Sequence, residues 1–319
     1  MSPRDIFFNN AGRLRSGWRV FIFAVLFVAV FWIFSNGVRV VYALIFNFAP
    51  TLSPHPFIQN LIYRVIFTSA ALGAGYVCIR WLEGLPWRAL GISLHHHWFR
   101  HLLIGSLIGV ASLALATGLA MAGGGLSLAI SPRHLLFEVG KTLVFSAALF
   151  TVAALAEESL FRGYPLQTLT RAQLGWLGVL LTSIPFAMAH LNNPNVVPYA
   201  SLNTGLAGVW LAVAYLRTRS LWFPLGVHWA WNWALGSLFG LPVSGINSLA
   251  PYPLMRGTDL GPAWLTGGSY GIEGGLACTI ALVVSTIFIW RTRLVAPTEE
   301  ILRLTSQENP AAARIGILP

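Results

Sequence analysis

Four side chains of the types found in hydrolytic sites lie in apolar stretches of the sequence: Glu157, His190, His228 and Asn232. Of the ten acidic residues, Glu157 and its neighbour Glu158 stand well inside such a stretch, and of the eight histidines only His190 and His228 do. A carboxylate or an imidazole can take a proton from water, and a second imidazole and a carboxamide can stabilise the resulting oxyanion. This combination of residue types predicts a hydrolytic site.

The two adjacent carboxylates are expected to have different partners. Neighbours on a helix are about 100° apart, so Glu157 and Glu158 cannot share one direction. Glu158 precedes Arg162 by four residues, which is the favourable order for an ion pair and leaves Glu157 as the candidate base. The alternative is that all three residues form a polar cluster that only packs helices.

The two histidine segments also have simpler interpretations. His228 and Asn232 are four residues apart and share a helix face, but four tryptophans flank them, so they could belong to an aromatic belt. His190 stands beside an Asn/Pro turn, where a hydrogen-bonded interface role is common. Pro185 should bend the helix that leads to His190.

A metal site is the other chemistry open to these residues. Glu157, His190 and His228 could hold a divalent ion such as zinc, which would acidify a bound water. The sequence contains no His-Glu-x-x-His helix signature. Spacing alone does not decide between metal-assisted hydrolysis and hydrolysis by the side chains themselves.

The composition requires a lipid environment for this site. The chain has 319 residues, 56% hydrophobic and only 9% charged, against roughly 25% charged in soluble domains. That excludes an ordinary water-soluble enzyme and a disordered chain. We predict an all-α, polytopic membrane bundle of about eight spans: Trp18–Phe34 (continuing through Val38–Phe48), Leu61–Ile79, Leu102–Gly123, Thr142–Arg162, Leu174–Leu191, Tyr199–Leu216, Leu221–Gly240 and Gly274–Trp290.

The net charge of +10 orients this bundle and does not indicate nucleic-acid binding. Arginines concentrate in alternate connections, which places both termini in the cytoplasm by the positive-inside rule. Residues 1–294 would form the bundle, with the motifs at about 140–240, and residues 295–319 a polar cytoplasmic tail. The compact chain, which carries no retention signal, favours a bacterial cytoplasmic (inner) membrane.

The ordered motifs resemble those of the CPBP family, which comprises CAAX prenyl endopeptidases, bacteriocin-processing enzymes and their relatives. The motifs are Glu157-Glu158-x-x-Phe161-Arg162, Phe186-x-x-x-His190 and His228-x-x-x-Asn232. The resemblance implies an intramembrane peptidase acting on a membrane-tethered protein or peptide in the bilayer. It further implies that Glu157 and His190 activate water, that His228 and Asn232 hold the oxyanion, and that Glu158, Arg162, Phe161 and Phe186 support the site.

Two other functions fit the same sequence. A non-catalytic immunity or scaffold protein could keep the motifs for bundle stability, and a proton-coupled transporter could use buried Glu and His as a relay. No inverted repeat supports the transporter. The depth of His190 is the least satisfactory point of the peptidase hypothesis, because a straight span would place it far from Glu157.

The remaining polar and small residues are interpreted as structural. Gly105-x-x-x-Gly109 and Gly236-x-x-x-Gly240 favour close helix packing. The tract His95-His96-His97 with His101 is expected to be solvated or to face headgroups, Arg64 to snorkel towards headgroups, and Lys141 to pair with Glu138. Cys78 and Cys278 are expected to be small core residues.

Overall fold

The computed structural model describes residues 3–9, 12–48 and 56–305, and these are mostly helical. The helices are α1 (Pro3–Phe7), α2 (Ser16–Phe48), α3 (Pro56–Leu82), α4 (Trp98–Ala122), α5 (Leu136–Glu158), α6 (Tyr164–Arg171), α7 (Gly175–Ala189), α8 (Pro198–Thr218), α9 (Trp222–Trp233), α10 (Ala263–Thr266), α11 (Leu276–Arg291) and α12 (Glu299–Thr305). Short 3-10 turns cover Trp87–Leu90, Arg133–Leu135, Gly268–Tyr270 and Ile272–Gly274, and π turns cover Ser159–Gly163 and Ala234–Leu238.

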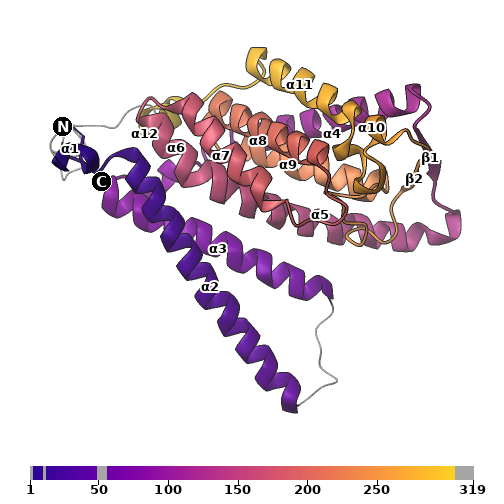
Figure 1. The fold of residues 1–319 in the computed structure, drawn as a ribbon, viewed down its shortest axis with the longest axis horizontal. Helices are drawn as coiled ribbons and strands as arrows, with labels where there is room; N and C mark the ends of the chain where they lie inside the picture. Colours follow the sequence, from indigo (N-terminus) through magenta and orange to yellow (C-terminus); the bar gives the residue numbers. More distant parts are fainter. Residues whose placement is uncertain (1–2, 10–11, 49–55, 306–319) are drawn as a thin grey trace.

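The helices divide into a bundle and an arm. Helices α2 and α3 extend away from the rest of the molecule in Figure 1 and are called the arm below. Phe23 of α2 stacks on Tyr164 of α6, with ring centroids 5.3 Å apart, and Ala74 and Cys78 of α3 belong to the same apolar cluster. The arm is therefore attached to the bundle at the α6 end.

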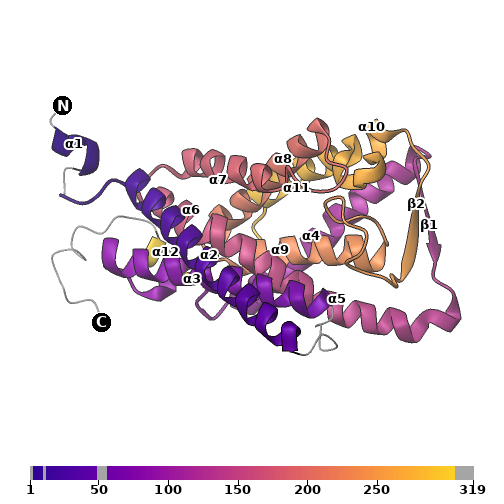
Figure 2. The same ribbon diagram turned by 60° about the horizontal axis from the view of Figure 1, so that its bottom comes forward.

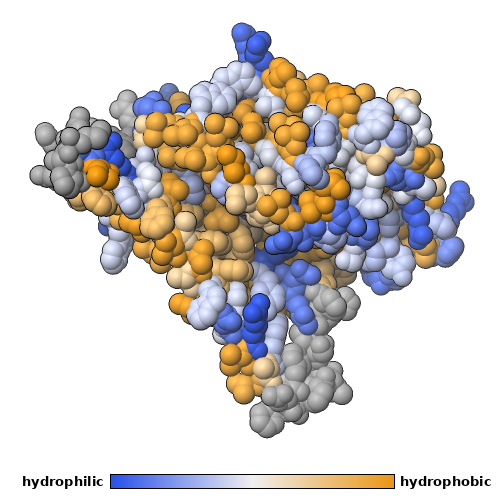
Figure 3. Space-filling view, in the orientation of Figure 1, coloured by the Kyte–Doolittle hydropathy of each residue, from blue (hydrophilic) through white to orange (hydrophobic). Residues whose placement is uncertain are grey.

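Much of the arm's outer surface is apolar and exposed. Trp32 and Phe34 are 66% and 60% exposed, although a soluble protein would bury side chains of this size. Hydrophobic residues likewise cover much of the face drawn in Figure 3, while hydrophilic residues gather near its centre, in the angle between the bundle and the arm. This surface is suited to contact with lipid.

Each predicted span overlaps a helix in the described ranges, namely α2, α3, α4, α5, α7, α8, α9 and α11. Four segments of those ranges are long and apolar enough to cross a membrane: Ser16–Ile45, Phe57–Leu82, Trp98–Ala122 and Arg133–Arg171. Gly175–Ala189 and Leu276–Arg291 are shorter apolar helices. The number of eight spans and the orientation of the termini stay predictions.

The described residues are mostly helical, as predicted, but one small sheet at an end of the bundle was not expected. Strands β1 (Leu126–Ile130) and β2 (Met255–Asp259) pair antiparallel, with Leu126 opposite Asp259 and Ile130 opposite Met255. They stand at the end opposite α1 (Figures 1 and 2). Each strand has five residues within a Gly-rich connection, and the pairing joins distant parts of the chain, so no local pattern indicates it.

The predicted tail, residues 295–319, is only partly within the described residues, since 306–319 lie outside them. The described part includes α12, where Ile301 is fully buried, and Val295 before it is 3% exposed. Arg88 and Glu300 form an ion pair at 3.2 Å across this contact. Residues 295–305 thus pack against the molecule.

Helices α4 and α9 approach closely through glycines, as predicted for Gly105 and Gly109. A β-carbon on Gly109 would collide with the Val227 carbonyl oxygen, and one on Gly105 would collide with that of Phe223. Gly226 of α9 faces the Leu102 carbonyl in the same way. Because α9 carries His228 and Asn232, this contact fixes the position of these two residues relative to α4.

We expect Gly109→Ala to destabilise the protein by about 1–3 kcal/mol, since the added methyl group would force α4 and α9 apart. The midpoint of thermal unfolding in detergent measures this effect. Gly118→Ala on the same helix is the matched control, because a β-carbon there meets no atom within 4 Å. Equal midpoints for the two variants would contradict the close approach.

Candidate active site

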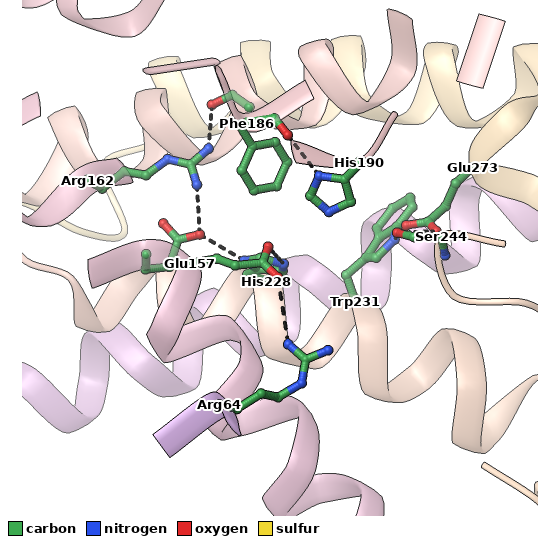
Figure 4. Close-up of polar contacts among 11 residues, drawn as sticks. Arg64, Glu157, Arg162, Phe186, His190, His228, Trp231, Ser244 and Glu273 are labelled. Carbon is green, nitrogen blue, oxygen red and sulfur yellow. Dashed lines mark hydrogen bonds and ion pairs between the residues drawn. The ribbon is translucent and has the colours of Figure 1, made fainter. Parts of the chain in front are cut away.

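Glu158, the last residue of α5, forms the buried centre of the site. Its side chain is fully buried, and its Oε1 accepts hydrogen bonds from Arg162 Nη1 at 3.0 Å and from His228 Nδ1 at 2.8 Å. Figure 4 labels these two donor residues. The predicted pairing of Glu158 with Arg162 is confirmed. The Glu158 carboxylate also orients the His228 ring, a role that the sequence did not indicate.

The Arg162 guanidinium is fully buried and is held by three further groups. Its Nη2 donates to the Gly208 carbonyl at 2.9 Å, and its Cζ lies 4.7 Å from the Phe186 ring centroid and 5.8 Å from that of Phe161. Phe161 and Phe186 pack edge to face, with centroids 5.4 Å apart. The two motif phenylalanines therefore position the buried ion pair, as a supporting role would require.

Glu157 faces away from Glu158, as the helix geometry predicts, and has no partner in its own helix among the ion pairs of the described residues. Its Oε2 lies 3.7 Å from His228 Nε2, and its Oε1 lies 3.9 Å from Arg64 Nη1 of α3. Its side chain is 22% exposed. Glu157 thus presents a carboxylate to open space between two helices.

The orientation of the His228 ring follows from its two carboxylate neighbours. Because Glu158 accepts a hydrogen bond from Nδ1, the proton sits on that nitrogen and Nε2 is directed towards Glu157. Asn232 lies about one turn further along α9 and lines the same cavity as His228. The shared face predicted for His228 and Asn232 is therefore the face that borders the cavity.

The geometry at His190 comes from the way α7 ends. The His190 N–H bonds to the Ala187 carbonyl at 3.1 Å, so the Phe186 carbonyl is left for the His190 ring, whose Nδ1 donates to it at 2.8 Å. A carbonyl can only accept, so Nδ1 carries the proton and Nε2 has the free lone pair in the neutral ring. The ring also rests against Phe186, with centroids 4.9 Å apart.

All four predicted catalytic residues line one cavity of about 600 Å³: Glu157, His190, His228 and Asn232. Phe161 and Phe186 line it too, while Glu158 and Arg162 are buried behind His228 and Phe186 of the lining. The arm supplies part of the lining, including Phe27, Phe31 and Phe67. The cavity therefore lies between the bundle and the arm.

Helix α7, which leads to His190, has only 15 residues and follows the short α6. It is therefore shorter than the span predicted for Leu174–Leu191. His190 lines the same cavity as Glu157. The difficulty that a straight span would place His190 far from Glu157 is therefore resolved.

Two π turns interrupt the helices that carry the motifs. One covers Ser159–Gly163, directly after the two glutamates, and the other covers Ala234–Leu238, two residues after Asn232. π turns of this kind occur often at functional sites, because the extra residue changes the direction of the side chains that follow. Here the first turn carries Phe161 and Arg162 to their places beside Glu158.

Glu273 is a site residue that the sequence analysis missed. Its Oε1 accepts from Trp231 Nε1 at 2.9 Å, and its Oε2 accepts from the Ser244 N–H at 2.6 Å. Burial raises the pKa of Glu273, and the bonds from Ser244 and Trp231 oppose that rise. The connection 241–273 therefore closes one side of the cavity. An acid in a Gly-rich connection gives no signal for this role.

Arg64 is the second missed residue. It was expected to snorkel towards headgroups, but its side chain is 29% exposed and its guanidinium faces Glu157 across the cavity. Its apolar sequence neighbours could not reveal this, because the contact depends on where the arm crosses the bundle.

The predicted metal set is not brought together as a coordination shell. Among the described residues, no group of three or more His, Cys, Asp or Glu side chains is arranged to hold a metal ion. His228 directs Nδ1 to Glu158 and His190 directs Nδ1 to a carbonyl, so Nε2 is the nitrogen of each ring that is left for a ligand. Because the described residues contain no cluster of three such side chains, the structure does not support the metalloprotease hypothesis, and the zinc site stays a prediction.

The other residues noted in the sequence lie outside the cavity or in its wall. Lys141 and Glu138 form the predicted ion pair at 2.8 Å, and both cysteines are buried and free. The expectation for the histidine tract is wrong for His95 and His101, which are 3% and 1% exposed. His95 Nε2 lies 3.0 Å from Ser220 Oγ, and burial lowers the pKa of His95.

The fold and the site thus define a largely helical, lipid-suited protein with a polar cavity between its helices. In a comparison with protein families, the family described as type II CAAX prenyl endopeptidase Rce1-like matches residues 139–234. The match contains all three motifs and confirms the resemblance to the CPBP family. Arg64 and Glu273 fall outside the matched segment.

A protein from Escherichia coli is similar to this chain over 94 residues, about the length of the family match. It is an uncharacterized 24.3 kDa protein, 37% identical over 94 residues, which is 29% of this chain. The match spans 42% of that relative's length.

Proposed function

We propose that this protein is an intramembrane endopeptidase that hydrolyses a peptide bond in a membrane-tethered protein or peptide. The observation that carries the proposal is the convergence of the Glu157 carboxylate, two imidazoles and the Asn232 carboxamide on one cavity bordered by long apolar helices. The family match supports a protease. We further propose that it resides in a bacterial cytoplasmic membrane.

The proposed reaction begins with a water molecule between Glu157 and His190. The Glu157 carboxylate and the lone pair on His190 Nε2 are two proton acceptors that face the cavity. As the water oxygen adds to the peptide carbonyl carbon, its proton passes to one of these groups. The same proton then goes to the leaving nitrogen, so that one carboxylic acid and one amine form.

The oxyanion of the tetrahedral intermediate needs hydrogen-bond donors that face the same cavity. The Asn232 carboxamide always has N–H donors and is the constant contribution. His228 can donate through Nε2 only when both ring nitrogens carry protons, because Nδ1 is bonded to Glu158. Glu158 and Arg162 act through His228 by fixing its ring, and touch neither water nor substrate in this proposal.

Hydrolysis can be tested by the origin of the new carboxylate oxygen. Candidate substrates are membrane proteins whose termini change when the gene is removed, as detected by mass spectrometry of cell membranes. Purified protein in liposomes should cut such a substrate in ¹⁸O-labelled water and place one heavy oxygen in the new C-terminal carboxylate. Failure to cut any such substrate, or proton flux in the same liposomes, would favour the scaffold or the transporter instead.

Assistance by zinc or another divalent ion is tested with the same preparation. Because the cavity residues do not form a ligand cluster among the described residues, we expect cleavage to continue after a chelator has removed the metal, with metal analysis to verify the removal. Loss of cleavage that only added metal restores would assign the reaction to the metal-assisted route.

A further inference from the structure

A second pocket, of about 470 Å³, lies where α4 begins and is called the α4 pocket below. The first turn of α4 and the residues just before it supply His96, His97, Arg100 and His101 to its lining. Residues 293–300, which lead from α11 into α12, form the rest of the lining. None of the described residues that line the α4 pocket also lines the candidate active site, so the two are separate.

The wall formed by residues 293–300 is held against the bundle. Arg100 Nη2 donates to the Leu294 carbonyl at 3.1 Å. Arg217 of α8 donates through Nε to the Thr292 carbonyl at 3.0 Å, directly before this wall. Val295 is 3% exposed. The α4 pocket is therefore built from segments that are already fixed to one another.

The α4 pocket has an excess of positive charge. Arg100 and Arg293 belong to its lining, and both are exposed. The lining also contains Glu299 and Glu300, but these form ion pairs at 3.3 Å and 3.2 Å with arginines that do not line the pocket. Since those pairs compensate the two carboxylates, the charges of Arg100 and Arg293 remain available to an anion.

The remaining polar groups of the α4 pocket also favour an anion. An α-helix leaves its first N–H groups without partners in the helix and carries the positive end of its dipole there, and α4 presents this end to the pocket. His101 is 1% exposed and lines the pocket, and its Nδ1 has no hydrogen-bond partner among the described residues. A protonated imidazole nitrogen is a donor, and leaving a buried donor unpaired is costly.

The histidines around the α4 pocket do not form a metal site. Among the described residues, no group of three or more His, Cys, Asp or Glu side chains is arranged to hold a metal ion. Desolvation, together with the charges of His96 and Arg100, lowers the pKa of His97, so a bound anion would relieve this repulsion.

The position of the α4 pocket indicates that the anion is part of a lipid. Helix α4 is long and apolar enough to cross a membrane, and the pocket lies at its first turn. Exposed apolar side chains stand next to the two arginines in the chain: Phe99 before Arg100 is 59% exposed, and Leu294 after Arg293 is 51% exposed. Basic pockets at the ends of membrane-spanning helices bind phosphate headgroups.

We propose that the α4 pocket binds the phosphate group of an anionic lipid, with Arg100 and Arg293 as its charged partners. Arginine forms strong, charge-assisted hydrogen bonds with phosphate oxygens. The acyl chains would lie against the apolar surface that begins at Phe99. A bound lipid would thus join the segment after α11 to the start of α4. This site is independent of the proposed peptidase, because it shares no described lining residue with the candidate active site.

The experiment measures lipid binding to the full-length protein in detergent micelles by native mass spectrometry. Dioleoylphosphatidylglycerol and dioleoylphosphatidylcholine have the same acyl chains and one phosphate each, but only the first has a net negative charge. We expect the first molecule of phosphatidylglycerol to bind about tenfold more tightly, which corresponds to about 1.4 kcal/mol. In the double variant Arg100→Gln/Arg293→Gln, the ratio of the two affinities should fall to about one.

The double variant Arg80→Gln/Arg291→Gln is the matched control. It removes the same charge, and both arginines are exposed residues near the ends of apolar helices that do not line the α4 pocket. It should keep the tenfold ratio of the original protein. The elution profile and the midpoint of thermal unfolding verify that each variant is folded. Equal binding of the two lipids, a ratio that survives Arg100→Gln/Arg293→Gln, or an equal loss in both double variants would overturn the proposal.

Competition with inorganic phosphate distinguishes a lipid headgroup from a free ion. We expect phosphatidylglycerol to stay bound in an excess of inorganic phosphate, because the ion cannot replace the contacts of the acyl chains. If inorganic phosphate displaces the lipid, and its own binding is lost in Arg100→Gln/Arg293→Gln, the ligand is a free phosphate ion and the assignment to a lipid is overturned. None of these measurements requires cleavage, so their result does not depend on whether the protein is a peptidase.

Discussion

Glu157→Gln should reduce the rate of peptide cleavage by about 10²–10⁴-fold, because it removes a proton acceptor that faces the cavity. The amide has nearly the same shape as the carboxylate and can still contact its neighbours, so the fold should persist. The rate is measured on a substrate identified by its changed terminus, with the variant and the original protein in the same liposomes.

The control for this result is Glu138→Gln on the same helix. Glu138 pairs with Lys141 at 2.8 Å near the start of α5, does not line the cavity and has a 37% exposed side chain. Cleavage should be unchanged. A Glu157→Gln protein that cuts at the original rate would refute the mechanism, and one that is inactive as a peptidase but restores the phenotype of a gene deletion would establish a scaffold.

Glu158→Ala should cost about 3–5 kcal/mol of stability, which is the usual effect of removing one partner from a buried ion pair. The loss would leave the Arg162 guanidinium without its carboxylate in a fully buried place and would free the His228 ring. The free energy of unfolding can be measured by titration with denaturing detergent in mixed micelles.

A pair with the same spacing but high exposure provides the comparison. Glu299 and Arg303 of α12 are also four residues apart, at 3.3 Å, with side chains 87% and 81% exposed. Glu299→Ala should cause no measurable change, because exposed pairs contribute little. If Glu158→Ala were equally mild, the Glu158–Arg162–His228 group would have no structural role of the kind described here.

The candidate-site motifs could be predicted from the sequence because each is a local spacing. Arg162 follows Glu158 by four positions, and Asn232 follows His228 by four. A helix turns such a spacing into a shared face without information from the rest of the chain. The polar groups also stood out against an apolar background. Spacing alone did not guarantee that the three motifs would line one cavity, and the structure shows that they do.

The sequence did not indicate the places of Arg64 and Glu273 or the pairing of β1 with β2, because each depends on contacts between distant segments. Arg64 has apolar sequence neighbours that resemble those of any snorkelling arginine, and its partner Glu157 is on another helix. Glu273 is in a Gly-rich connection and meets Trp231 and Ser244 only after that connection folds back. The β1–β2 pair likewise needs both connections to be in place.

Because the connection 241–273 folds back onto the cavity, a shortened protein that lacks it would have an incomplete site. A fragment limited to residues 139–234 would hold every group to which the proposed cleavage is assigned. It would lack Glu273, which accepts a hydrogen bond from Trp231, and the part of the cavity lining that the arm supplies. Such a minimal piece would expose its polar interior to lipid. The motif-bearing centre therefore depends on its less recognisable flanks for a closed cavity, and the two must be kept together in any shortened protein.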